Sequence, residues 1–187
     1  MPPTMLQHFC TLARANRLAN YRLHAACLQL SDADFKATRI GFFPSLWATL
    51  NHILIVDWYY IAALHGEADL RRAFHSDTPF DEMVAVSSAQ QVSDERLIAW
   101  CERADDAALN TEIAMDRGDH VQRDLACHVL MHRFSHQIHH RGQAHAMLSG
   151  TTIKSPQLDE FLMPSDAKFR TQDVAALGWT EATLFPR

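Results

Sequence analysis

The chain has 187 residues, of which 48% are hydrophobic, and its formal net charge at pH 7 is −5. This length suits one domain with a single core, and the ordinary hydrophobic content excludes disorder over most of the chain. The sequence has no run of Lys and Arg, which together with the negative charge argues against a nucleic-acid-binding protein. We therefore expect a globular protein that acts without nucleic acid.

The start of the chain and its cysteines bear on the cellular compartment. The first ten residues, MPPTMLQHFC, lack the basic flank and apolar segment of a signal peptide. The four cysteines lie far apart and form no C-x-x-C pair, which is typical of reduced thiols. We therefore expect a cytoplasmic protein.

Apolar residues recur at helical spacing along most of the sequence. Between Met5 and Leu30 they lie three, four or seven residues apart, which predicts a long first helix. Ser-Asp-Ala-Asp, which follows, predicts a turn that opens a short helical piece. Further long helices are expected from residues 43–45 to about His65, from about Ser93 to Ala108, and from about Asp124 to Leu148.

The most apolar stretch, Phe42 to Leu64, has about the length of a membrane span. Asn51, His52 and Asp57 lie in its middle, however, and each of these side chains would be costly in lipid. The stretch is therefore predicted to be a buried helix, and no association with a membrane is expected.

Three segments depart from the helical pattern. Residues 66–92 are mixed and polar, and they predict the longest irregular connection. Residues 111–123 change period around Asp-Arg-Gly-Asp, which predicts a small β-hairpin before the last long helix. Residues 151–187 are too apolar to be free in solvent, and they predict a C-terminal tail that packs on the helices. The whole pattern predicts an all-α fold, a four-helix bundle in a single domain over residues 1–187.

Histidine is the unusual residue of this chain. There are 12 histidines, and six of them lie between residues 128 and 145. Residues four apart share a helix face, so neighbouring members of a series with this spacing can bind one metal ion as a pair. The two ends of the series differ by about 120° in direction, so all four cannot bind the same ion. The members of this series are His128, His132, His136 and His140. Spacing leaves open which pair would bind the ion. It also leaves open that all four are simply surface or hydrogen-bonded residues.

A third imidazole would have to come from another helix. His52 is the best candidate, because it lies in the most apolar stretch, where an unpartnered imidazole is costly. Imidazole ligands favour Zn, Ni, Cu or Fe over Mg or Ca. The histidine series lacks the Glu that follows the first His in zinc proteases, which excludes that class.

Two motifs carry a resemblance to a known family. The last long helix contains H-x-x-x-H-R-G-Q over residues 136–143, and the second contains T-L-N-H-I-L over residues 49–54. With Ala15–Asn20, Arg22–Leu23 and Pro156–Phe161, these motifs resemble the DinB/YfiT-like family of metalloenzymes over most of the chain.

The resemblance implies a four-helix bundle with an unusual chain order. It also implies a metal site built from one histidine of the second long helix and two of the fourth, which here are His52, His136 and His140.

Helical phase predicts three further side chains near this site, each three, four or seven residues from an expected ligand: Gln143, His132 and Tyr59. Gln143 would hold a ligand or the substrate, or make an ordinary hydrogen bond between helices. For Tyr59, a hydroxyl in the cavity and a packed aromatic ring are both consistent with its position. Asp57 points away from the site and is expected to cap the helix or pair with a basic residue such as Arg141. No residue is assigned as catalytic.

The resemblance also implies a chemistry. Family members of known role are mostly metal-dependent thiol transferases or isomerases, which use mycothiol, bacillithiol or glutathione and are often homodimers. Three imidazoles leave coordination positions open, as in catalytic metal sites. We therefore expect a thiol S-transferase with a small-molecule substrate, a low-molecular-weight thiol and one divalent metal, with Zn or Ni ahead of Fe or Mn. The alternatives are a metal-dependent hydrolase and a non-catalytic, metal-binding stress-response bundle.

Overall fold

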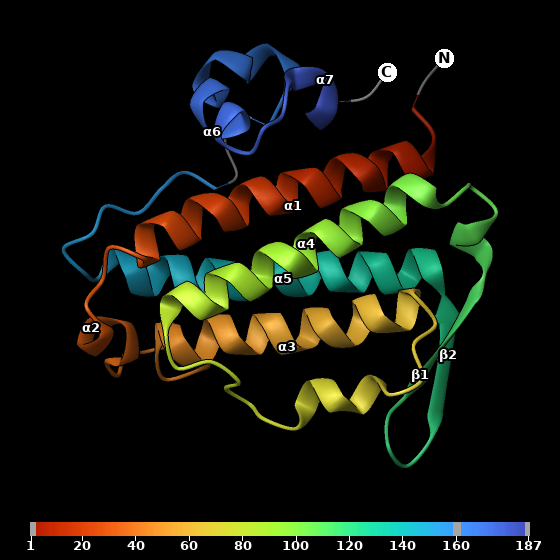
Figure 1. The fold of residues 1–187 in the computed structure, drawn as a ribbon, viewed down its shortest axis with the longest axis horizontal. Coiled ribbons are helices and arrows are strands. Elements are labelled where there is room, and N and C mark those ends of the chain that lie inside the picture. Colours follow the sequence, from red (N-terminus) through yellow and green to blue (C-terminus); the bar gives the residue numbers. More distant parts are fainter. Residues whose placement is uncertain (1–2, 159–161, 186–187) are drawn as a thin grey trace.

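The computed structural model of the chain describes residues 3–158 and 162–185. A two-stranded antiparallel sheet, β1 (Glu112–Asp116) and β2 (Val121–Leu125), precedes the last long helix. The predictions of a mainly helical chain and of a hairpin at this point are therefore confirmed. Four long helices lie side by side (Figure 1): α1 (Met5–Cys27), α3 (Leu46–Leu64), α4 (Met83–Arg103) and α5 (Ala126–Ser149).

Local side chains define where the helices begin. Thr4 and Gln7 form a capping box at the start of α1, in which each side chain bonds the backbone N–H of the other residue. The Ser45 hydroxyl accepts from the N–H of Ala48 at 3.1 Å and caps α3. Shorter helices complete the structure: α2 (Asp32–Lys36), η1 (Leu70–Phe74), η2 (Ala108–Asn110), η3 (Pro164–Phe169), α6 (Thr171–Ala176) and α7 (Glu181–Leu184).

Ring contacts show that α3 and α5 run antiparallel. His52 lies against His136, with 5.0 Å between ring centroids. Tyr60, two turns further along α3, lies 5.1 Å from His132, one turn earlier in α5. The packed faces bury most of α3, which explains why this helix reads as an almost continuous apolar stretch. In the described part of the chain, no helix is both long and apolar enough to cross a membrane.

The start of α4 differs from the prediction. The helix begins at Met83 and ends at Arg103, whereas the sequence predicted a start near Ser93 and an end near Ala108. Its first half buries only Met83, Val86 and Gln90, and one of these is polar. Val84 and Val92 are apolar but exposed, so the apolar residues of this half do not mark one face, and the weak helical period explains its assignment to an irregular connection.

The described part of the C-terminal segment packs on the outer side of α1 (Figure 1). Val174 and Leu184 form a small apolar cluster with Leu18 of α1, and Arg22 pairs with Asp173 at 2.7 Å. The last residues of the motif Pro156–Phe161, which the resemblance included, lie outside the described residues.

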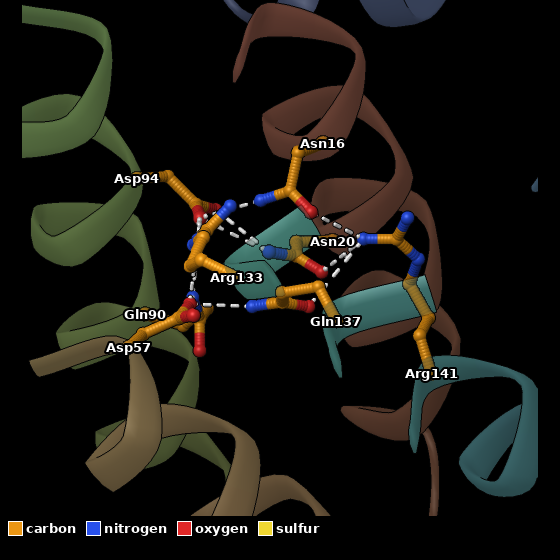
Figure 2. A network of polar contacts seen from close by, with 8 residues as sticks. All are labelled: Asn16, Asn20, Asp57, Gln90, Asp94, Arg133, Gln137 and Arg141. Atoms are coloured by element: carbon orange, nitrogen blue, oxygen red, sulfur yellow. Dashed lines mark hydrogen bonds and ion pairs between the residues drawn. The ribbon is translucent and has the colours of Figure 1, made fainter. Parts of the chain in front are cut away.

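A buried polar network joins the four long helices (Figure 2). Nη2 of Arg133 lies 2.7 Å from Asp57 Oδ2 and 3.6 Å from Asp94 Oδ1, and all three side chains are fully buried. A buried network of paired charges favours one helix arrangement, because another arrangement would separate Arg133 from its carboxylates. Each long helix contributes, and the members are Asn16, Asn20, Asp57, Gln90, Asp94, Arg133, Gln137 and Arg141.

Asp57 thus pairs with a basic residue, as expected, but this residue is Arg133, and the choice of Arg141 was wrong. Arg141 instead donates to the side-chain oxygens of Asn16 and Asn20 at 2.7 and 3.1 Å. Helical phase gives the direction of Asp57 on its own helix, but it does not determine which turn of α5 lies opposite.

His24 of α1 predicts how stability depends on pH. Burial, followed by the charges of Arg17 and Arg141, lowers its pKa from 6.5 to about 3. Between these values the unfolded chain binds a proton that the folded chain does not, so the free energy of unfolding falls as pH falls from 6.5 towards 3. This one group contributes a slope of up to about 1.4 kcal/mol per pH unit.

We expect His24→Met to show a shallower pH dependence than the wild type in urea unfolding of the metal-free protein between pH 4 and 6. His8→Met changes an exposed histidine of the same helix and should keep the wild-type slope. Equal slopes in all three proteins would show that His24 is protonated without cost in the folded state.

Candidate metal centre

Three histidines from two helices meet at one point between α3 and α5. Nε2 of His52 lies 3.1 Å from Nε2 of His136. The His140 ring lies 4.7 Å from the His52 ring and 4.5 Å from the His136 ring, between centroids. One nitrogen from each of the three rings lies within 4.8 Å of the others, so the group could hold a metal ion.

The tertiary structure selects one pair from the histidine series. His136 and His140 face α3 and meet His52 there, whereas the His132 ring lies 6.4 Å from the His136 ring and contacts Tyr60. His128 lies a further turn away, near the β-hairpin. Side chains four residues apart on a helix differ by about 40° in direction, and over the series this difference separates the histidines into two pairs with different surroundings.

Burial keeps these imidazoles neutral at pH 7. Burial, followed by the effect of the neighbouring His140, lowers the pKa of His52 to about 4 and that of His136 to about 3. The pKa of His140 is also lowered, mainly by burial. Neutral imidazoles have the free lone pair that metal coordination requires.

The surroundings of the rings fit a transition metal ion. Two nitrogens bound to one ion at about 2.0–2.1 Å are about 2.9–3.4 Å apart in octahedral or tetrahedral geometry. The 3.1 Å between the His52 and His136 nitrogens falls in this range. Nδ1 of His140 lies 2.7 Å from Gln143 Oε1, a contact that fixes the ring and leaves Nε2 as the nitrogen available to a metal.

Comparison with known proteins agrees with this geometry. The model of the DinB family matches residues 5–173, which is most of the chain. The chain belongs to the DinB family. No curated protein matches it.

The matched region of this DinB-family chain includes every residue predicted from the sequence to line the site. Gln143 contacts the cluster through His140, and its amide nitrogen also lies 3.2 Å from His139 Nε2. Tyr59 is buried and donates its hydroxyl to the backbone oxygen of Asp116 at 2.7 Å, in the β-hairpin. Its ring is thus packed in the core, and Tyr60 is the tyrosine that contacts the histidine series.

Sequence reasoning missed Phe43. Its ring lies 4.2 Å from the His52 ring and 5.5 Å from the His140 ring, between centroids. Phe42 is 76% exposed and packs edge-on against Phe43. Both residues lie in the connection before α3, and the path of a connection cannot be derived from helical periodicity. The only feature of the sequence that could have indicated a role for Phe43 is the pair of aromatic residues before Pro44.

Proposed function

We propose that this DinB-family protein is a metal-dependent transferase that acts with a low-molecular-weight thiol. In this proposal His52, His136 and His140 bind one divalent transition metal, Zn or Ni ahead of Fe or Mn. The observation that carries the proposal is the convergence of three neutral imidazoles, two of them only partly buried. Three protein ligands leave coordination positions for a small molecule, and partial exposure lets that molecule enter.

The residues around the histidines have separable tasks in this function. Gln143 orients the His140 ring through the contact with Nδ1, so that Nε2 remains free. Phe43 covers one side of His52 and His140 and excludes water from that side. A metal held here would supply a Lewis acid that lowers the pKa of a thiol.

The proposal also includes the assembly and its setting. We infer that the four long helices form the four-helix bundle that the resemblance implies, as one domain with the C-terminal segment packed on it. We also propose a homodimer in the cytoplasm that acts on a small molecule, without nucleic acid or membrane. Size-exclusion chromatography with light scattering tests the dimer directly.

The test of the function is elemental analysis of untagged wild-type protein beside His52→Ala and His140→Ala. We expect about one transition metal ion per wild-type chain and loss of it in both variants. Transfer of glutathione to an electrophilic acceptor should follow the metal content. Metal absent from the wild type, or retained in both variants, would contradict the site. Metal without any thiol transfer would leave a metal-binding protein of another function.

A further inference from the structure

A concave site lies next to the three histidines, where α3, α5 and the β-hairpin meet. It is a cavity of about 250 Å³. Pockets for drug-sized ligands are larger, about 300–1,000 Å³, so this cavity suits one end of a small molecule. Its polar lining consists of Tyr60, Arg117, Gln122, Asp124, His128 and His132.

His132 connects this cavity to the metal centre. Its ring lines the cavity and lies 5.1 Å from the Tyr60 ring. On the other side, the same ring lies 6.4 Å from the His136 ring. A molecule that extends for a few bond lengths past His132 can therefore occupy the cavity and reach the three histidines.

The Arg117 guanidinium is held in place without an acidic partner. Its Nε donates to Gln122 Oε1 at 2.9 Å and its Nη2 to the Tyr60 hydroxyl at 3.1 Å, and it lies 5.1 Å from the centre of the Tyr59 ring. Among the described residues, no carboxylate lies within ion-pair distance of it, and Nη1 makes no hydrogen bond to them. A fixed guanidinium of this kind is suited to bind a carboxylate of a ligand.

Asp124 gives the cavity an opposite charge beside this cation. Gln122 lies between the two groups, since its Oε1 accepts from Arg117 and its Nε2 donates to Asp124. The two charges thus line one cavity but do not neutralise each other by direct contact. A ligand that carries a carboxylate and an ammonium close together would complement both.

We propose that this cavity binds the zwitterionic α-amino-acid end of the thiol, with its carboxylate on Arg117 and its ammonium on Asp124. The inference rests on the proposed function, because it names the class of thiol that the metal centre would use. It adds a specificity site, built from the hairpin and α5, to that function.

The test compares glutathione with two synthetic peptides that differ only at its γ-glutamyl end. Glutaryl-Cys-Gly lacks the ammonium, and 4-aminobutanoyl-Cys-Gly lacks the carboxylate. Isothermal titration calorimetry on the metal-loaded full chain should show that glutathione binds about tenfold or more tightly than either peptide, as expected for losing one charged hydrogen-bonding group.

Two variants assign the preference to its residues. Arg117→Gln should lose the discrimination against the peptide without the carboxylate, and Asp124→Asn the discrimination against the peptide without the ammonium. Arg123→Gln is the matched control, because Arg123 belongs to the same hairpin, on β2 with Asp124, but is 58% exposed and pairs with Glu112. Peptides that bind the wild type as tightly as glutathione would overturn the proposal, as would discrimination that survives in both pocket variants.

Failure of the proposed function is distinguishable from failure of this inference. The same titrations with the S-methylated forms of the three peptides, on metal-free protein, probe the cavity without the thiol or the metal. In these titrations, a preference for S-methylglutathione that depends on Arg117 and Asp124 would support the proposed ligand of the cavity even if the protein transfers no thiol. Normal metal content and thiol transfer without that preference would overturn the proposed ligand of the cavity and leave the proposed function intact.

Discussion

Replacing Asp57 with Ala is expected to destabilise the protein by about 3–5 kcal/mol, because it leaves a buried charge without its main partner. Asp57 accepts from Arg133, Gln90 and Gln137, and it is fully buried. Without it, Arg133 would retain only Asp94, at 3.6 Å, and its Nε and Nη1 already lack partners in the described structure. For a chain of this length the change corresponds to a fall of about 10 °C in the melting temperature. Urea unfolding and differential scanning calorimetry measure it.

An exposed ion pair on the same protein provides the matched control. Glu112 pairs with Arg123 at 3.1 Å, and both side chains are 58% exposed. Glu112→Ala should change the free energy of unfolding by less than about 1 kcal/mol. An Asp57→Ala protein as stable as the Glu112→Ala protein would show that Asp94 alone compensates Arg133.

Replacing His136 with Ala is expected to abolish metal binding and thiol transfer while the fold persists. The His136 side chain contacts the other histidines, and its Nδ1 has no hydrogen-bond partner in the described part of the chain. Its removal therefore leaves no backbone group unpaired, and the metal-free variant should be within about 1–2 kcal/mol of the metal-free wild type.

Thermal unfolding with and without added Zn²⁺ or Ni²⁺ measures how much the metal stabilises each protein. A metal present at a thousand times its dissociation constant stabilises the wild type by about 4 kcal/mol, whereas His136→Ala should show no such gain. His145→Ala, on the same helix but outside the cluster, should keep the gain in stability and the activity. A metal-dependent gain that persists in His136→Ala would contradict the three-histidine site.

The polar network and the candidate metal centre both use side chains of α5. Arg133, Gln137 and Arg141 point into the polar network, while His136 and His140 point towards α3. Within each set the residues are four apart, so each set occupies one face of the same helix. The network thereby fixes the rotation of α5 and, with it, the direction of both histidines.

The sequence by itself determined the long helices, the hairpin and the histidine series, because these depend on local periodicity and turn chemistry. Residues that are near in sequence share a helix face wherever the helix lies, so His136 and His140 were recognisable as a pair of neighbours. The apolar stretch around His52 made it the candidate for a third imidazole, and the family motifs selected His136 and His140 from the series. Where periodicity was weak, as in the first half of α4, the same reasoning gave a start ten residues too late.

Only the tertiary structure decided which faces meet. The pairing of Asp57 with Arg133, the position of Phe43 over the histidines and the meeting of Arg117 with Tyr60 all join residues far apart in the chain. Helical phase gives the direction of a side chain on its own helix, but the relative shift and rotation of two helices depend on packing across the whole core. These long-range contacts build the site, and no local pattern encodes them.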